Sequence, residues 1–500
     1  MKARTFDEML PDFSAELDAI KKKGISIDLI NKIITKHAAN SEYNRKLYDR
    51  YKTVLSGIPI FNRTPRYEEE ENPINNRVNN DFFSEIVDFK VGYFAGEPIS
   101  YSYSDTQEAV EVTGGEEKTE KVKKCLTDFT TRNNMFGVDM ETTKNASIYG
   151  YSGRLFYIDK DGAERVMPIH GFETIILSST DISEPEYAIR YYRVKDINQH
   201  ESYVVEFYDD RDIYIYRGTL NALKFEMRKE HCFDFCPLQG IANNKECLGD
   251  AEKVINLIDD YDKIVSDNSN EIEAFVHAMM IVQMNADEDV IKKAQKSGAL
   301  IVPPVGSNPV QEPVKWITKN INDAFTENHL KRLEDNIYRF SRTPNMNDAV
   351  FSSASGVALK FRLHGLETKC ATFEANVMNA SQYMWKVLCS SWAKKSIIAD
   401  PLQFCMEFSR NFPLDRLSEA QTAQAFIAAG LPKRWVFSQI SGVDDIDYIL
   451  QLIEEEKGDI TPLFDDNDDN ADDDNGGNLK NDKIDDNNVV PDDEGQIDEE

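Results

Sequence analysis

Residues 314–370 read VKWITKNINDAFTENHLKRLEDNIYRFSRTPNMNDAVFSSASGVALKFRLHGLETKC, and they carry the clearest structural signal in the chain. Apolar residues recur at helical spacing from 320 to 342, which predicts an amphipathic helix. Pro344 should end it, because proline removes a backbone donor and crowds the preceding turn. After a polar segment of small residues, a long helix is predicted from about Val357 to Trp392.

Upstream, residues 247–272 predict another long helix with one apolar stripe. The stripe consists of Val254, Leu257, Ile258, Tyr261, Ile264 and Val265, and the aspartates off it are Asp259, Asp260 and Asp262. Between this helix and the next, residues 276–315 hold the strand-like runs AMMIVQM and ALIVPPV around a helical DEDVIKKAQK. The pattern therefore predicts two long helices that flank a small α/β insert.

The remaining segments predict an α+β fold. Residues 1–60 have helical periodicity, and residues 146–236 contain tyrosine-rich, strand-like runs separated by turn signals. The polar run QEAVEVTGGEEKTEKV at 107–122 is predicted to be a mobile loop with Gly114 and Gly115 at its tip. Residues 416–457 predict two or three further helices.

Composition bounds the class of protein. The chain has 500 residues, 41% of them apolar, so two or more structural units are expected. It shows neither an apolar run of transmembrane length nor a signal-like N-terminus, which predicts a protein that stays in the cytoplasm where it is made. The seven scattered cysteines fit reduced thiols better than a disulfide framework. A net charge of −31 argues against ordinary, tight DNA binding, which relies on basic patches.

The C-terminal segment separates by composition. Residues 465–500 contain sixteen acidic residues against two lysines, so they should be disordered. A calcium-loop interpretation fails, because Gly476 and Lys483 stand where oxygen ligands are required. An interaction role and a plain solubilising role remain equally open for this tail.

Catalytic motifs are missing from the sequence. It has no phosphate-binding glycine loop and no zinc-protease motif, and the run Gly150–Arg154 departs from a nucleophile elbow at its last position. We interpret that run as a turn before a strand. The zinc candidates are His231, Cys232, Cys236 and Cys247, but their spacing is loose, and strand alternation would place Cys232 and Cys236 on one face as small apolar residues. No catalytic residue, metal or cofactor is therefore expected.

Four segments, in this order, resemble the portal proteins of siphophage-type tailed bacteriophages, also called head-to-tail connectors. They are residues 72–102, 247–275, 314–370 and 408–456. The family forms closed rings, usually of about twelve subunits, at one capsid vertex. The resemblance implies a wing (1–246 and 357–415), a stem (247–275 and 316–342), a clip (276–315), a tunnel loop (343–356), a crown (416–457) and a disordered tail (458–500).

The resemblance also implies site residues. The tunnel loop would touch DNA through Asn345, Met346, Asn347, Asp348, Phe351, Ser352 and Ser353. Lys331 and Arg332 are possible phosphate contacts on the second stem helix, with a solvated helix face paired to Glu334 or Asp335 as the alternative. In the clip, Met284, Lys292, Lys293 and Lys296 mark the approximate docking site for terminase or an adaptor.

The implied partners are further copies of the chain, double-stranded DNA, the terminase large subunit, scaffolding and major capsid proteins, and a head-completion protein. No membrane partner is expected, and the protein would be assembled in the host cytoplasm into the virion. Two alternatives stay open at this point: a ring-forming scaffold without DNA passage, and a nuclease or hydrolase with an unrecognised site in the β-rich region.

Overall fold

A computed structural model describes most of the chain. The residues described are 11–65, 74–104, 115–195, 197, 199–276, 280–283, 287, 290, 299–302, 314–316, 323–346, 356–411, 416–437, 440, 450 and 452–453. The chain divides into two units, Met1–Pro413 and Leu414–Glu500. Among the described residues, no helix combines the length and the apolar character needed to cross a membrane.

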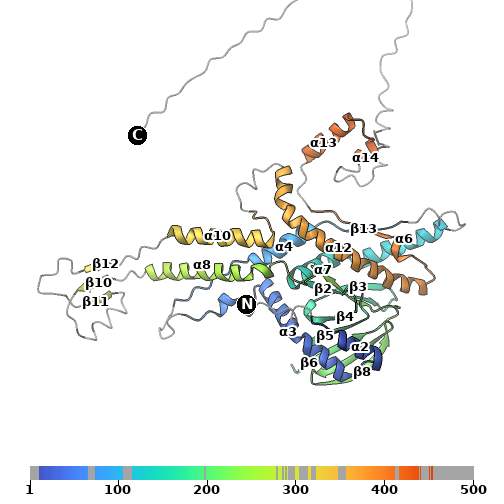
Figure 1. The fold of residues 1–500 in the computed structure, drawn as a ribbon, viewed down its shortest axis with the longest axis horizontal. Coiled ribbons are helices and arrows are strands. Elements are labelled where there is room, and N and C mark those ends of the chain that lie inside the picture. Colours follow the sequence, from blue (N-terminus) through green and yellow to red (C-terminus); the bar gives the residue numbers. More distant parts are fainter. Residues whose placement is uncertain are drawn as a thin grey trace, which may run out of the picture. The chain divides into compact units, whose positions relative to one another are not determined.

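The largest sheet in the first unit is antiparallel, with the strand order β4-β5-β6-β7-β8. Its strands are β4 (Thr174–Leu177), β5 (Tyr187–Lys195), β6 (Glu201–Tyr208), β7 (Asp212–Thr219) and β8 (Ala222–Glu230). Two helices, α2 (Ser14–Lys23) and α3 (Ile27–Tyr51), lie alongside this sheet (Figure 1). The Ser26 hydroxyl caps the start of α3. Ile189 and Val205 join the apolar face of α3 in one core.

A smaller antiparallel sheet has the order β3-β2-β9. Its strands are β2 (Tyr151–Ile158), β3 (Glu164–Ile169) and β9 (Leu238–Ala242). Helix α7 (Met135–Tyr149) leads directly into β2 through Gly150, whose φ is +92°. A Cβ on Gly150 would lie 1.9 Å from the Cys247 carbonyl oxygen. Glycine is therefore required at this junction, because both its backbone conformation and the available space exclude a side chain.

The long helix α12 (Gly356–Lys394) passes both the small sheet and the strand pair formed by β1 (Ser100–Tyr103) and β13 (Phe404–Glu407). Trp385 of α12 stacks on Phe404 with ring centroids 4.3 Å apart. Further helices of this unit are α4 (Phe82–Ala95), α6 (Gly115–Arg132), η1 (Pro59–Asn62), η2 (Gly171–Glu173), η3 (Glu252–Val254) and η4 (Pro401–Gln403).

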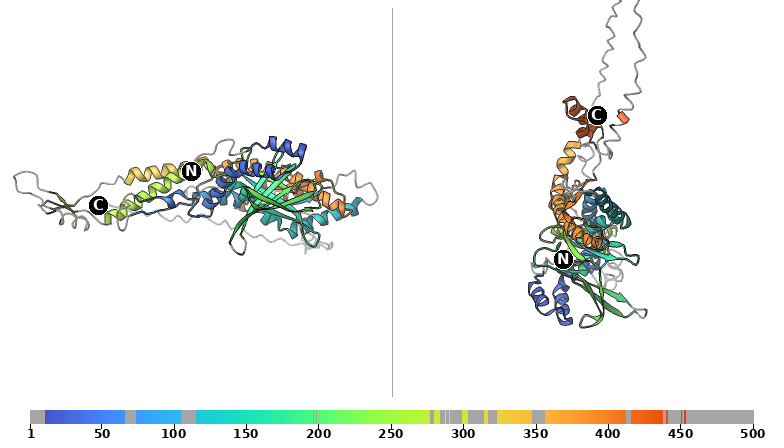
Figure 2. Two further views of the ribbon diagram at one scale, coloured as in Figure 1. Left: turned by 90° about the horizontal axis from the view of Figure 1, so that it is seen from below. Right: turned by 90° about the vertical axis from the view of Figure 1, so that its right-hand side faces the viewer.

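Two helices, α8 (Ile255–Val276) and α10 (Asp323–Ser341), run side by side in Figure 1 and in the left view of Figure 2. The chain between them contains a three-stranded sheet of order β11-β10-β12. Its strands are β10 (Met280–Gln283), β11 (Ala299–Val302) and β12 (Val314–Trp316). β10 pairs in parallel with β11 and antiparallel with β12. The predicted pair of long helices and the strand-like runs AMMIVQM and ALIVPPV between them agree with α8, α10, β10 and β11, whereas the predicted helical run DEDVIKKAQK lies outside the described residues except for Asp287 and Val290.

In the second unit, α13 (Arg416–Ala428) and α14 (Lys433–Phe437) pack through Phe426 and Trp435, whose ring centroids lie 5.8 Å apart. These helices agree with the predicted helical character over 416–437, and most of 438–457 lies outside the described residues. The predicted disordered tail, 458–500, lies outside the described residues.

The predicted α+β class is confirmed, since helices combine with mainly antiparallel sheets. Three details of the sequence prediction are wrong. Residues 115–122 belong to α6 rather than to a mobile loop, because Val122 occupies the buried face of an amphipathic helix. Cys232 and Cys236 do not share a strand face, since β8 ends at Glu230. Tyr151, Ser152 and Gly153 lie within β2 rather than in a turn before that strand.

Candidate functional site

The candidate site is the helical hairpin formed by α8 and α10, together with the buried polar cluster at its base. Apolar residues on the facing sides of the two helices, Ile258 and Ile337 among them, share one core with α4. Phe82 at the start of α4 lies edge-on to Tyr261 of α8 and to Tyr338 of α10, at 5.1 and 5.8 Å between ring centroids. The hairpin is therefore fixed at its base by packing against α4.

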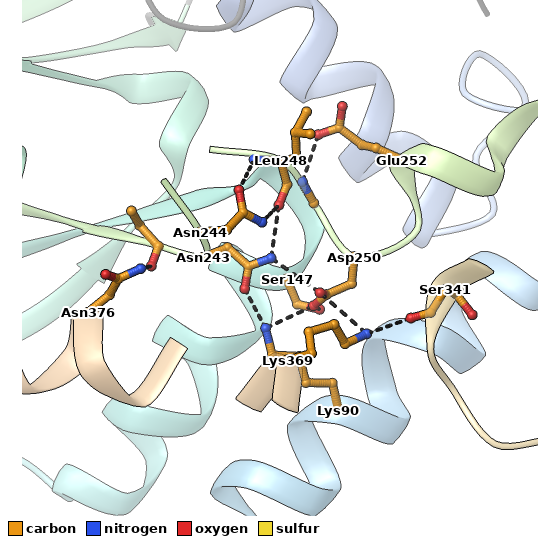
Figure 3. Close-up of polar contacts among 12 residues, drawn as sticks. Lys90, Ser147, Asn243, Asn244, Leu248, Asp250, Glu252, Ser341, Lys369 and Asn376 are labelled. Carbon is orange, nitrogen blue, oxygen red and sulfur yellow. Dashed lines mark hydrogen bonds and ion pairs between the residues drawn. The ribbon is translucent and has the colours of Figure 1, made fainter. Parts of the chain in front are cut away.

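Charged groups are buried at that base (Figure 3). Asp250, just before η3, has an ion pair with Lys90 of α4 at 3.0 Å and a second with Lys369 of α12 at 3.4 Å. Lys90 and Asp250 have side chains that are 0% and 2% exposed. Ser147 of α7 donates a hydrogen bond to Asp250. Lys90 also donates to Asn243, which follows β9, and so one cluster joins α4, α7 and α12 to the first residues of the hairpin.

The cluster also contacts the last residue of α10, where the second helix of the hairpin returns to the base. Lys369 donates a hydrogen bond of 3.0 Å to the carbonyl oxygen of Ser341, the last residue of α10. Burial acts to raise the pKa of Asp250, but the ammonium groups of Lys369 and Lys90 outweigh it and hold that pKa below its usual value. Burial lowers the pKa of Lys369. The carboxylate of Asp250 thus stays ionised between two cations and ties both ends of the hairpin to α12.

The exposed side of α10 carries cations. Lys331 and Arg332 are both exposed, and within the described residues neither has an ion-pair partner. The predicted alternative, a pairing with Glu334 or Asp335, is therefore not seen among them. Glu334 instead accepts a hydrogen bond of 2.8 Å from the Asn345 side-chain amide.

Only part of the predicted site lies within the described residues. Asn345 is held against α10 by that hydrogen bond, and Met346 is 50% exposed. The other predicted tunnel-loop residues, Asn347, Asp348, Phe351, Ser352 and Ser353, lie outside the described residues. The predicted clip residues, Met284, Lys292, Lys293 and Lys296, also lie outside them.

The zinc candidates have other roles. His231 accepts the Phe233 N–H at Nδ1, while Nε2 lies 3.1 Å from the Asp209 carbonyl oxygen. Cys236 is buried, which raises the pKa of its thiol to about 12, whereas Cys232 is exposed. In the described part of the chain, no group of three or more His, Cys, Asp or Glu residues is arranged to hold a metal.

The run Gly150–Arg154 is structural. Gly150 ends α7, and Ser152 lies inside β2 rather than on an exposed turn. Arg154 is buried and pairs with Asp139 at 2.9 Å. Because Ser152 is itself buried and has no histidine among its hydrogen-bond partners, the geometry offers no nucleophile here.

Sequence reasoning missed the buried cluster, although one signal pointed to it. Lys90 lies in the run FFSEIVDFKVGYFA, three and four residues after Val87 and Ile86 and next to Val91, so it shares the apolar face of its helix. A lysine on a buried face requires a compensating carboxylate. The sequence could not show that the carboxylate is Asp250, because 160 residues separate the two.

Comparison with known proteins agrees with this geometry. Residues 30–463 match the family model described as "Phage portal protein, SPP1 Gp6-like". The portal protein of Clostridium phage phiCD119 is 22% identical over 434 residues, which cover 82% of this chain and 90% of that protein. The portal protein of Bacillus phage SPP1 is 23% identical over 308 residues, 58% of each chain. Since the family model spans most of its length, this chain belongs to the SPP1-like phage portal proteins.

Proposed function

We propose that this chain assembles into a ring, of about twelve copies, through which double-stranded DNA enters and leaves the phage capsid. Portal proteins are structural components of the phage particle rather than enzymes, and their roles in genome packaging and in joining head to tail follow from the family. The observation that carries the proposal is the α8–α10 hairpin, rooted in a buried charge cluster and carrying a small sheet between its helices. Copies of such a hairpin set side by side would wall a channel.

Charge supports a conduit that does not hold DNA tightly. The net charge of −31 repels phosphate at long range, and Asp260 on the exposed side of α8 adds to that effect. Lys331 and Arg332 project from α10 without ion-pair partners among the described residues, so they are available to touch passing phosphates. This combination of overall negative charge and a few exposed cations favours rapid passage of DNA in both directions over stable DNA binding.

The parts of the ring are assigned by the same proposal. Residues 1–246 and 357–415 form the wing, 247–275 and 316–342 the stem, and 416–457 the crown. The tunnel loop, 343–356, would narrow the channel, with Asn345 anchored to α10 at its start. The clip, 276–315, would dock the terminase large subunit during packaging and a head-completion protein afterwards. Scaffolding and major capsid proteins would meet the wing in the assembling capsid, which forms in the host cytoplasm and becomes the virion.

Imaging and sizing of the purified protein test the assembly. A ring with a central hole and a mass of about 685 kDa, twelve times the 57.1 kDa chain, is expected. A protein that stays monomeric or dimeric at all concentrations and salts would contradict the proposal. Metal-dependent cleavage of DNA by the pure protein would instead favour the enzyme alternative.

The phosphate contacts have their own test. Lys331→Ala with Arg332→Ala should leave rings intact and change the salt dependence of DNA packaging. A matched control replaces Lys224 and Lys229, which are exposed on β8, and should leave packaging unchanged. If both variants package DNA equally well at every salt concentration, Lys331 and Arg332 do not contact the passing DNA.

A further inference from the structure

An extended segment before α4, residues 74–80, lies along α8 (Figure 1). Three alternate backbone N–H groups, those of Asn76, Val78 and Asn80, donate to side chains of α8. Asn76 donates to Asn270 at 2.6 Å, Val78 to Ser266 at 2.9 Å, and Asn80 to Asp262 at 2.8 Å. We call Asp262, Ser266 and Asn270 the polar ladder, and residues 74–80 the strap.

The spacing of the N–H donors along the strap matches the spacing of the acceptors along α8 for a physical reason. Two residues of extended chain advance about 6.6 Å, while four residues of α-helix advance about 6 Å. Acceptors spaced four apart on α8 can therefore satisfy alternate amides of a strap that runs antiparallel to the helix. Side chains add to the ladder, since the Asn76 amide donates to Glu273 at 2.6 Å and the Asn80 amide to Asp262 at 2.9 Å. The α8 surface is thus a recognition site for extended backbone.

The strap is held by polar contacts rather than by a core. None of its residues is buried. Arg77 donates to the Phe61 carbonyl oxygen at 2.6 Å, and Asn75 donates to that of Arg63 at 3.1 Å. Individual hydrogen bonds contribute little net free energy, because water replaces them when they break. The body of the fold, in contrast, rests on several large apolar clusters that do not include the strap.

We propose that residues 74–80 form a detachable strap, which the polar ladder of α8 holds in register and releases while the rest of the chain stays folded. Release would uncover one side of α8 and free the hairpin to tilt about its buried base. The use of that motion during DNA passage rests on the proposed conduit function. The strap itself does not depend on it.

Hydrogen exchange on the full-length protein tests the strap directly. Peptides that span 74–80 should show protection of about 10- to 1,000-fold, well below that of the apolar clusters. Ser266→Ala with Asn270→Ala removes the acceptors of the Val78 and Asn76 amides, so it should abolish the protection of these two amides and leave α8 and α10 protected. The control Lys263→Ala, exposed on the same helix, should change neither. Unprotected amides in the unaltered protein, or amides that exchange only on global unfolding, would overturn the proposal.

A reversible lock tests the motion. Asn76→Cys with Glu273→Cys, in a background with Cys125, Cys232 and Cys405 changed to Ser, is bridged by a short reducible thiol crosslinker. Locked rings should assemble normally but lose at least tenfold in DNA packaging, and reductant should restore it. Locked rings that package as well as reduced ones would refute release. If the unaltered protein forms no rings, the proposed conduit function is wrong. The hydrogen-exchange experiment then still shows whether residues 74–80 form a detachable strap.

Discussion

Replacing Asp250 with Asn should destabilise the fold strongly, because it removes one negative charge between two buried cations. Asn keeps the size of the side chain and can accept the hydrogen bond from Ser147. Lys90 and Lys369 would then face each other without a counter-charge. The substitution therefore isolates the contribution of charge from that of packing.

The lengths of the two ion pairs of Asp250 determine the expected loss of stability. At 3.0 and 3.4 Å, and with an effective dielectric constant of about 20, each attraction is worth about 5 kcal/mol before desolvation. Removing one partner of a buried ion pair costs about 3–5 kcal/mol net, and the upper part of that range is expected here. Lys90→Met should cost less, about 1–3 kcal/mol, because Asp250 keeps Lys369 as its counter-ion.

Chemical unfolding at neutral pH, followed by circular dichroism, measures these differences on ring-free protein. Lys386→Met on α12 is the matched control, since its ion pair with Glu184 at 3.3 Å is 40–49% exposed and should be worth less than about 1 kcal/mol. The stability that Asp250 supplies is present above its unfolded pKa and is lost as the pH falls below about 4, because its folded pKa is lowered.

An Asp250→Asn variant whose free energy of unfolding lies within about 1 kcal/mol of that of the unaltered chain would contradict a large electrostatic contribution from Asp250. An equal cost for Lys90→Met and Asp250→Asn would also contradict it. Either result would mean that the cluster is not the electrostatic base of the hairpin.

Three more perturbations have defined outcomes. Burial raises the pKa of Asp262 from 3.8 to about 6, so the protein loses stability as the pH rises through that window. At pH 7, Asp262→Asn should therefore raise the free energy of unfolding by up to about 3 kcal/mol in a denaturant titration. Below about pH 4 the variant should have no advantage, because Asp262 is then protonated in both the folded and the unfolded chain. Gly150→Ala should cost several kcal/mol or prevent folding. Gly24→Ala has open space around it but keeps the unfavourable backbone conformation, with a φ of +75°, so it should cost less, about 1–3 kcal/mol in thermal unfolding. Arg154→Met should cost about 3–5 kcal/mol by chemical unfolding, because it leaves buried Asp139 unpaired; a loss below 1 kcal/mol would contradict this expectation.

Much of the element order is local and was predictable. Helical periodicity predicts α8 and α10, and Pro344 agrees with the end of α10 at Ser341. Alternating β-branched and aromatic residues predict β5, β6 and β7. The sequence prediction missed β12, a strand of three residues, because so short a run carries no recognisable period.

The candidate site was predictable only in outline. The α8–α10 hairpin follows from its sequence pattern, and the cations Lys331 and Arg332 are exposed, as a polar helix face requires. Asn345 was assigned to a loop, but its hydrogen bond to Glu334 depends on how the chain turns after α10. Such a contact cannot be read from periodicity, because periodicity describes one element at a time.

Residue order alone thus indicates which face of each helix is apolar, since an amphipathic pattern needs no knowledge of the neighbour. The identity of that neighbour is a property of the folded chain. Asp250 becomes a buried counter-ion because α4 and α12 deliver Lys90 and Lys369 to it from distant positions. In the same way, the polar face of α8 reads as a solvated surface until the strap lies on it, and then Asp262 is buried among amides. Burial and charge pairing depend on long-range contacts, which only chain packing creates.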